Sequence, residues 1–412
     1  MPHTGSMQIL HTSDWHVGRT LHGESLSDSI DAFFTWLKEL VIQRKIDVVL
    51  ISGDVFDRSV PPVHAVRQLS RYLTDLAGHT RIILTSGNHD GPIRLGMFSD
   101  LLSDSLVIAT EPEQIGTAIE CGTVDDGALI YPVPYLEPDL VRQILSDQEI
   151  NEETSQPVPL ARSHEAVMGA ALRRIHDDLC KRRAQGDVRP AIAMPHAFIT
   201  GGSASDSERN IEVGGVAHVP AGIFDTLGGK NAPVAHLAYV AAGHLHRPQQ
   251  ISRTLVPVFY SGSPVAYSFS EYQVNKRVYL LDTEAVDEAG YLHPQPIDIP
   301  VHRPIAVLRG TMDQLTTDPD PNDQASYCSI TVTDDLRPDR MIPRLKTIYP
   351  YALIIQHESS LTPPSHTGVS AVSSRSDTEI SLEFFELLGG AKLTDTERGI
   401  IQDTWEQVRK QA

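Results

Sequence analysis

Five apolar segments of this chain each end in aspartate, asparagine or histidine, and this repeated arrangement restricts the fold more than any other feature. Buried strands of an open sheet are continuous apolar runs, and such sheets place their chemistry at the strand ends. Oxygen and imidazole ligands at five strand ends predict a centre for divalent metal ions. The five clusters are Asp14-Trp15-His16, Gly53-Asp54-Val55-Phe56-Asp57, Gly87-Asn88-His89-Asp90, His196 and Gly243-His244-Leu245-His246.

The residue types in these clusters fit a phosphoesterase that uses two metal ions, in which one carboxylate is shared by both. We predict that Asp54 is this bridge, because the preceding glycine lets the backbone turn sharply at the strand end. Asp14 and His16 can face one ion only across a non-helical bend. Alternate residues of an extended segment share a face, so His244 and His246 can serve two adjacent ions.

The remaining cluster residues complete the predicted centre. Asn88 supplies a neutral carbonyl oxygen, and His196 becomes a ligand candidate because it follows an apolar run in the same manner as the other clusters. His89 can stay off the metal and donate a proton to the leaving oxygen. Asp90 or Asp57 can orient the imidazole of His89. The other histidines have no partner motif, and we expect core or loop positions for them.

The first part of the chain alternates strands and helices, which favours a layered and largely parallel sheet. Apolar periodicity predicts strands at Met7–Thr12, Asp47–Ser52 and Arg81–Thr85, with helices at Leu26–Arg44 and Pro62–Ala77. A further helix is predicted at Ser163–Arg183, a polar and mobile loop at Gly201–Arg209, and closing strands at Val256–Tyr260 and Arg277–Asp282.

A Pro-rich and acidic stretch, residues 282–304, predicts a domain boundary. After it, strand, helix and strand are expected at Tyr327–Thr333, Arg337–Tyr349 and Tyr351–His357. Two terminal helices are predicted at Ile380–Leu388 and Thr394–Val408, beyond a Ser/Thr/Pro-rich linker. The first has Leu382, Phe385 and Leu388 on one face, an apolar stripe that serves either as core or as a docking face for a partner.

Composition sets bounds on the function. The net charge of −19 counts against strong nucleic-acid binding on its own, although bound divalent ions offset local carboxylates. Cys121, Cys180 and Cys328 lie far apart, which argues against a disulfide framework or a structural zinc site and favours a reducing cytoplasm. We find no segment typical of a membrane span or signal peptide, and we expect Met1–Ser6 to be a disordered leader.

The strand-end motifs resemble the signatures of the calcineurin-like metallophosphoesterases. Longer segments are similar to the bacterial SbcD family of nuclease subunits, and together they extend over the whole first domain. The second half of the chain is more weakly similar to the capping domain of that family, mainly through Arg337–His357. The segments similar to the SbcD family are Thr12–Gly23, Pro195–Arg209, Gly243–Gln249 and Tyr260–Ser270.

The resemblance implies an α/β fold of two packed sheets flanked by helices, followed by a small α+β capping domain and C-terminal helices. The expected parts are a nuclease domain at residues 7–283, a DNA-binding capping domain at 300–360, a linker at 361–378 and partner-docking helices at 379–412. The family is typically a homodimer through helices of the nuclease domain. This makes Leu69 and Leu73, on the helix predicted at Pro62–Ala77, candidates for the dimer contact.

The resemblance also implies a manganese-dependent exonuclease and endonuclease that acts on DNA ends and hairpins, in DNA repair, recombination and replication. Such a protein works with an SbcC-type coiled-coil ATPase. Its catalytic acid would be His89. Carried over residue by residue, one Mn²⁺ would be held by Asp14, His16, Asp54 and His246, and the other by Asp54, Asn88, His196 and His244.

Two alternatives remain open from the sequence. The chain could hydrolyse nucleotides or another small phosphodiester, although such an enzyme would not need the second domain and terminal helices. It could also be a scaffold that binds DNA ends without cutting, which the complete ligand set disfavours. The protein phosphatases of the calcineurin-like superfamily are also disfavoured. They carry the motifs GDxVDRG and GNHE, whereas this chain has Ser59 after Arg58 and Asp90 in place of the final glutamate.

Overall fold

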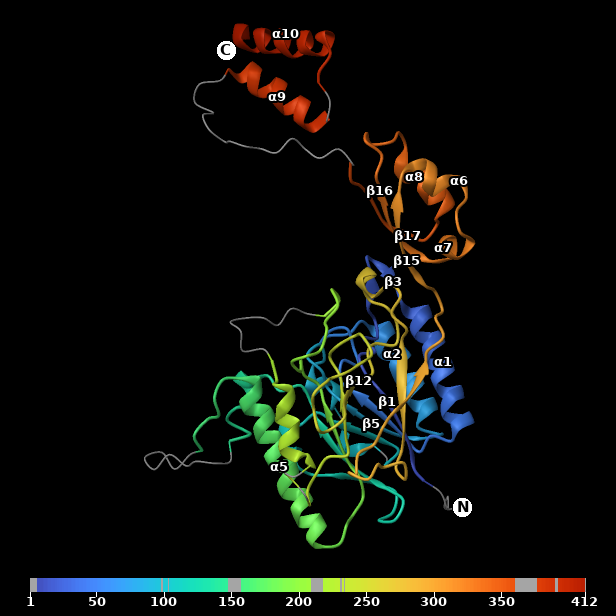
Figure 1. The fold of residues 1–412 in the computed structure, drawn as a ribbon, viewed down its shortest axis with the longest axis vertical. Coiled ribbons are helices and arrows are strands. Elements are labelled where there is room, and N and C mark those ends of the chain that lie inside the picture. Colours follow the sequence, from blue (N-terminus) through green and yellow to red (C-terminus); the bar gives the residue numbers. More distant parts are fainter. Residues whose placement is uncertain are drawn as a thin grey trace. The chain divides into compact units, whose positions relative to one another are not determined.

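The computed structural model describes residues 6–97, 99–102, 104–146, 157–208, 218–229, 232, 234–359, 376–389 and 392–411. The chain divides into two units, Met1–Pro304 and Ile305–Ala412 (Figure 1). Within the described residues, no helix is both long and apolar enough to span a bilayer.

The first unit contains a sheet with the strand order β14-β13-β1-β4-β5-β6. Strands β1, β4, β5 and β6 are parallel, and β13 runs antiparallel to β1. Because the four parallel strands point the same way, their carboxyl ends meet at one edge of the sheet. The strands are β1 (Gln8–Thr12), β4 (Val48–Ser52), β5 (Arg81–Thr85), β6 (Leu106–Ala109), β13 (Arg277–Asp282) and β14 (Gln295–Asp298).

A second sheet of the same unit has the order β11-β12-β10-β9-β8-β7. Its inner strands β8, β9, β10 and β12 are parallel, and β7 and β11 are antiparallel edge strands. The strands are β7 (Ile119–Cys121), β8 (Ala128–Val133), β9 (Ala191–Pro195), β10 (Tyr239–Ala242), β11 (Gln249–Gln250) and β12 (Val258–Tyr260), and a separate hairpin pairs β2 (Thr20–Leu21) with β3 (Glu24–Ser25).

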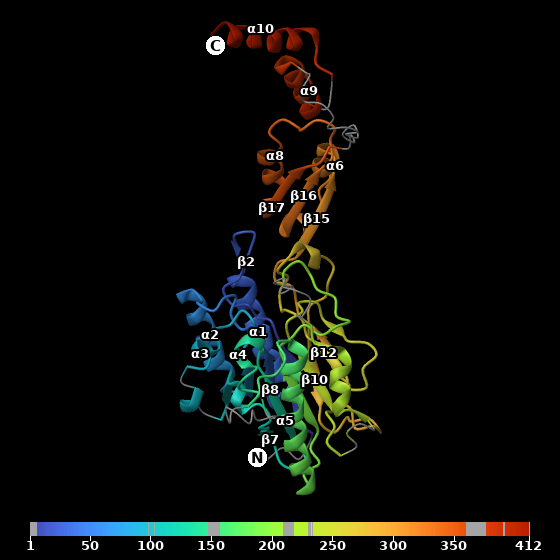
Figure 2. The same ribbon diagram turned by 90° about the vertical axis from the view of Figure 1, so that its left-hand side faces the viewer.

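Side-chain alternation along the strands builds the layers. In β4, Val48 and Leu50 face the second sheet and lie in one apolar cluster with Ile192 of β9. The intervening Val49 and Ile51 face helices α1 (Ser27–Arg44) and α2 (Val63–Leu76). Helix α5 (His164–Ala184) covers the outer face of the second sheet, so two sheets pack face to face between helical layers (Figure 2). The predicted α/β architecture is therefore confirmed.

The helices of this unit form where apolar residues recur at helical spacing. Helix α1 buries Phe33, Phe34 and Leu37 on one face, and it ends at Lys45, whose left-handed φ of 52° lets its N–H bond back to Val41. The longer helices are α1 (Ser27–Arg44), α2 (Val63–Leu76) and α5 (His164–Ala184), and the shorter ones are α3 (Pro92–Leu95), α4 (Pro138–Val141) and the 3₁₀ turns η1 (Ser99–Leu101), η2 (Pro112–Gln114), η3 (Ala221–Leu227) and η5 (Phe269–Glu271).

One expectation needs correction. The first domain is expected to end at residue 283, but β14 pairs with β13 and extends the first sheet to Asp298. The candidate dimer residues Leu69 and Leu73 are 4% and 7% exposed; they pack on the core beneath α2 and also line an apolar groove along this helix, so the dimer contact stays a prediction. The exposed face of the same helix presents Val63 and Val66.

The second unit begins with a three-stranded parallel sheet of order β15-β16-β17. The expected strand-helix-strand pattern is present as β16, α8 and β17, whereas β15, α6 and α7 were not predicted. The terminal helices α9 and α10 follow the linker expected at 361–378, which lies outside the described residues up to residue 375. The elements are β15 (Ile305–Gly310), α6 (Met312–Thr317), α7 (Pro321–Ala325), β16 (Tyr327–Val332), α8 (Met341–Ile348), β17 (Ala352–His357), α9 (Asp377–Gly389) and α10 (Asp395–Gln411).

Candidate metal centre

The predicted ligands gather where the carboxyl ends of the two sheets meet. They follow β1, β4 and β5 of the first sheet and β9 and β10 of the second. Ser52, at the end of β4, joins the sheets through two hydrogen bonds: His196 Nδ1 lies 2.8 Å from its carbonyl oxygen, and its Oγ donates to the carbonyl of Ala241 at 2.8 Å. All but one of the predicted ligands are at most 3% exposed: Asp14, His16, Asp54, His196, His244 and His246, with Asn88 half-buried.

Unusual backbone conformations aim these side chains. Four of the predicted ligands have positive φ, a region that residues with a Cβ rarely adopt: Asp14 at 54°, His16 at 42°, Asp54 at 49° and His244 at 116°. The non-helical bend expected between Asp14 and His16 is therefore present. Between them, Trp15 is fully buried among the aromatic side chains under α1 and α2, which anchors the bend.

Glycine allows the loops to approach closely. A Cβ on Gly87 would lie 2.1 Å from Asp54 Oδ1, and a Cβ on Gly243 would lie 1.8 Å from the carbonyl oxygen of Ser52. Both distances are far inside van der Waals contact, so a side chain at either position would push the strand ends apart.

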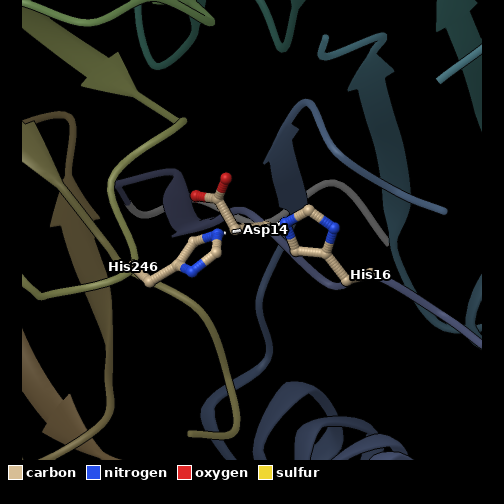
Figure 3. Close-up of side chains that lie close together, drawn as sticks. All are labelled: Asp14, His16 and His246. Atoms are coloured by element: carbon tan, nitrogen blue, oxygen red, sulfur yellow. Dashed lines mark hydrogen bonds between the residues drawn. The ribbon is translucent and has the colours of Figure 1, made fainter. Parts of the chain in front are cut away.

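One group of ligand atoms comes from Asp14, His16 and His246. The Nε2 atoms of the two imidazoles are 3.1 Å apart. Figure 3 shows the three side chains converging on one point. Asp54 Oδ2 lies 3.4 Å from His16 Nε2 and so borders the same group.

A second group lies on the other side of Asp54. The same Oδ2 atom is 3.4 Å from His196 Nε2. Asn88 Oδ1 lies 3.1 Å from His196 Nε2 and 3.0 Å from His244 Nδ1. One carboxylate thus faces two sets of nitrogen and oxygen donors, which is the arrangement that a bridging ligand requires.

Burial keeps most of these imidazoles neutral. It lowers the pKa of His16 and His246 well below the ordinary value and that of His244 to about 3. Burial also works against ionisation of Asp54, but the neighbouring His196 and His16 hold the pKa of this carboxyl well below its usual range. Burial opposes protonation of His196 as well, yet Asp54 raises the pKa of His196 to about 9. The three neutral imidazoles and the ionised carboxylate fit a divalent cation.

His89 lies beside the first group, with its ring 4.6 Å from that of His16. Its Nδ1 is 2.8 Å from an oxygen of Asp57, but this oxygen belongs to the backbone carbonyl and not to the side chain. The Asp57 carboxylate instead pairs with Arg19 at 3.4 Å. Orientation of the His89 ring at Nδ1 therefore comes from the backbone of Asp57.

The Asp90 carboxylate has a different partner set from the one expected. It accepts backbone N–H groups from Gly87 at 2.9 Å, Phe56 at 2.8 Å and Val55 at 3.0 Å. These donors belong to the loops after β5 and β4, which carry Asn88 and Asp54. Asp90 thus ties the two loops together.

The sequence interpretation missed the contacts around His246. The loop predicted to be mobile places Ser207 and Glu208 against this residue, and the structure describes it up to residue 208. Arg19 holds the loop by donating to the carbonyl oxygen of Ser207 at 2.5 Å. The spacing of apolar residues could not predict that this loop is ordered, because side-chain hydrogen bonds hold it in place.

Comparison with known proteins identifies the family of this chain. The sequence model of the calcineurin-like phosphoesterases matches residues 7–248, which include every predicted ligand. The SbcD component of the SbcCD nuclease of Bacillus subtilis is 36% identical over 293 residues, covering 69% of this chain and 68% of the relative. The chain belongs to the SbcD family of calcineurin-like phosphoesterases. The corresponding SbcD protein of Escherichia coli K12 is 30% identical over 321 residues, covering 75% and 72% of the two chains.

Membership confirms the family resemblance and the class of chemistry. The chain is a metal-dependent hydrolase of the nuclease type, with candidate ligand groups for divalent ions. Among solved structures, TT1561 of Thermus thermophilus aligns with a TM-score of 0.37 and 14% identity over 71% of this chain and 99% of that chain, which is too distant to add to the assignment.

Replacing Asp90 tests its role in tying the loops. We expect Asp90→Asn to lower the free energy of unfolding by about 2 kcal/mol, because an amide nitrogen would face buried N–H groups that need an acceptor. Denaturant unfolding of the metal-free chain measures this. The control is Asp75→Asn, whose side chain on α2 is 51% exposed and pairs with Lys38. Equal stability of the two variants would contradict the role assigned to Asp90.

Proposed function

We propose that this chain cuts DNA at double-strand ends and hairpins by two-metal hydrolysis of the phosphodiester, together with a coiled-coil ATPase of the SbcC type. The single observation that supports this best is the position of Asp54 Oδ2, 3.4 Å from an imidazole nitrogen of each ligand group. The relatives are named as the SbcD components of SbcCD nucleases, and these names support both the nuclease activity and an SbcC partner.

The proposed centre divides its ligands between two ions. Asp14, His16, Asp54 and His246 would hold one ion, and Asp54, Asn88, His196 and His244 the other. A mixed set of carboxylate, amide and imidazole donors suits Mn²⁺, which accepts both oxygen and nitrogen ligands. When bound, such ions lower the pKa of a coordinated water and stabilise charge that develops on the phosphate.

The chain's own groups would supply the remaining chemistry. His89 would act as the general acid that protonates the leaving oxygen, with its Nδ1–H donated to the Asp57 carbonyl at 2.8 Å. That bond leaves Nε2 as the atom that delivers the proton. The carbonyl can accept Nδ1–H in both the neutral and the protonated ring, so it holds the ring in place through the transfer.

A nuclease assay separates this proposal from its alternatives. The substrate is a labelled DNA hairpin, tested with and without Mn²⁺ and with and without the ATPase partner. Metal-dependent cutting that ATP and the partner stimulate supports the proposal. Hydrolysis of a small phosphodiester without DNA cutting would favour the first alternative, and DNA-end binding without any hydrolysis would favour the scaffold.

We also propose that the chain acts as a cytoplasmic homodimer. An apolar groove of about 1370 Å³ lies along α2 and the α3 region, lined among others by Val66, Ile93 and Met97. These side chains are 44%, 91% and 59% exposed. A second copy of the chain that covers this face would remove the exposed apolar surface from water. The three cysteines are all free, which fits a reducing compartment.

The terminal helices are proposed to dock on the coiled coil of the ATPase. They contact each other through Trp405, which donates to Ser381 Oγ at 2.8 Å, and through an Arg398–Glu386 ion pair. Phe384 and Phe385 of α9 stay about half exposed. Exposed aromatic residues on a short helical hairpin suit binding of a helix in a groove. The side chain of Leu388, part of the predicted stripe, lies outside the described residues.

Asp54→Asn tests the bridge. The amide cannot join two cations as a carboxylate does, so we expect the variant to lose at least one metal ion per chain. Elemental analysis after removal of loosely bound ions measures the content. Retention of two ions by the variant would show that Asp54 is not the bridge.

His89→Ala separates chemistry from binding. We expect this variant to keep its metal ions and its DNA affinity and to lose rate by on the order of 10²–10⁴-fold, the usual contribution of general acid–base catalysis. Single-turnover cleavage, metal analysis and a DNA-binding titration are measured together. Parallel loss of metal would instead make His89 a ligand.

Removal of the terminal helices tests the docking proposal. A chain that ends near Leu361 should bind metal and cut single-stranded DNA slowly, but it should fail to co-purify with the ATPase and lose ATP-stimulated cutting. Phe385→Asp in the full chain serves as a matched variant that leaves the chain length unchanged. If both variants bind the partner with full affinity, the helices have another role.

A further inference from the structure

Ser207 lies on the far side of the His246 ring from the ligand group. Its Oγ is 2.6 Å from His246 Nδ1, whereas His246 Nε2 is the atom that faces His16. The two ring nitrogens point in different directions, so Ser207 does not compete for the position of a metal ion. It contacts only the nitrogen that a metal would leave free.

The proton arrangement at Ser207 follows from its second partner. Ser207 Oγ donates to Glu271 Oε1 at 2.9 Å. The Glu271 side chain is fully buried and forms an ion pair with Lys276, so it is a carboxylate that can only accept. Ser205 Oγ also lies 2.7 Å from Ser207 Oγ, but a neutral hydroxyl is a weaker acceptor than the Glu271 carboxylate. Because the single proton of Ser207 goes to Glu271, its oxygen accepts a hydrogen bond from Nδ1–H of His246.

This arrangement fixes the tautomer of the ligand. With its proton on Nδ1, His246 keeps the lone pair of Nε2 free and directed at the ligand group of Asp14 and His16. A hydrogen bond at the second nitrogen is the usual device that orients a metal-binding histidine and sets its tautomer.

The same buried network holds the backbone of His246. Lys276 Nζ donates to the carbonyl oxygen of His246 at 2.9 Å and to Ser263 Oγ at 2.8 Å, and it pairs with Glu271. Its three protons are thus all used. Glu208 Oε1 accepts the backbone N–H of His246 at 2.7 Å. Both backbone polar groups and the ring of His246 are therefore held in place.

We infer that Ser207 is a positioning residue: it links the buried Glu271–Lys276 pair to His246 and presets this histidine to bind a divalent ion through Nε2. The inference rests on the two-metal centre proposed above. It gives the loop at residues 203–208 a defined part in building that centre.

Metal binding to the full chain tests this inference. The metal-free protein is titrated with Mn²⁺ while the free ion is followed by electron paramagnetic resonance. We expect Ser207→Ala to weaken one of the two sites by roughly 10–100-fold, the usual loss when the partner of a ligating histidine is removed. Ser207→Thr, which keeps the hydroxyl, should restore the affinity. Ser203→Ala, an exposed serine of the same loop, should bind as the unmodified chain does.

A double-mutant comparison separates positioning from a general structural effect. Ser207→Ala should cause no further loss of affinity in a His246→Ala chain, because its target is gone. In a His244→Ala chain it should cause its full loss of roughly 10–100-fold. Loss of the same size in both backgrounds, or unchanged affinity in Ser207→Ala alone, would overturn the inference. Failure of the unmodified chain to bind two ions would instead count against the two-metal centre.

The tautomer can be observed without metal. In the metal-free chain with ¹⁵N-labelled histidine, the His246 ring should show the signature of a protonated Nδ1 and a bare Nε2. Ser207→Ala should shift this ring toward a mixture of tautomers, while Ser203→Ala should not. A ring protonated at Nε2 in the unmodified chain would also overturn the inference.

Discussion

The centre depends on one contact, the approach of the two sheets at their carboxyl ends. Ser52, the last residue of β4, contributes to it with two groups: its carbonyl oxygen contacts the ring of His196 and leaves no room for a side chain on Gly243, and its hydroxyl donates to Ala241. If the sheets moved apart at this point, the candidate ligands of the first sheet and those of the second could no longer reach a common ion. The layered packing therefore determines the geometry of the site.

Such a site is costly to fold, because it buries several ionisable groups and holds four residues at positive φ. The protein offsets this cost with fixed hydrogen bonds. Asp14 accepts the backbone N–H of His244 at 3.0 Å and the hydroxyl of Ser13 at 2.5 Å, and Asp54 accepts the N–H of His89 at 2.8 Å. The bonds from His244 and His89 cross between loops, so each carboxylate that could bind an ion also holds two loops in register.

The sequence predicted the parts of this arrangement that depend on local pattern. Apolar runs located the strands, and the polar residues behind them located the side chains that gather where the sheets meet, because strand ends and parallel pairing leave few places for such residues. The sequence could not show that Asp90 ties two loops or that a backbone carbonyl orients His89, since both depend on which groups meet in space. It also missed β15, and it described as mobile a loop that is ordered by Ser207 and Glu208.

The acidic composition is compatible with a DNA substrate once the position of the charges is considered. The chain has 53 acidic and 34 basic residues, yet most carboxylates nearest the centre are buried. Asp90 and Glu208 accept hydrogen bonds from backbone N–H groups, and Glu271 forms an ion pair with Lys276. Asp14 and Asp54 lie within the ligand groups, where divalent cations would offset their charge. The repulsion that a phosphate backbone meets at the site is therefore smaller than the net charge of the chain suggests.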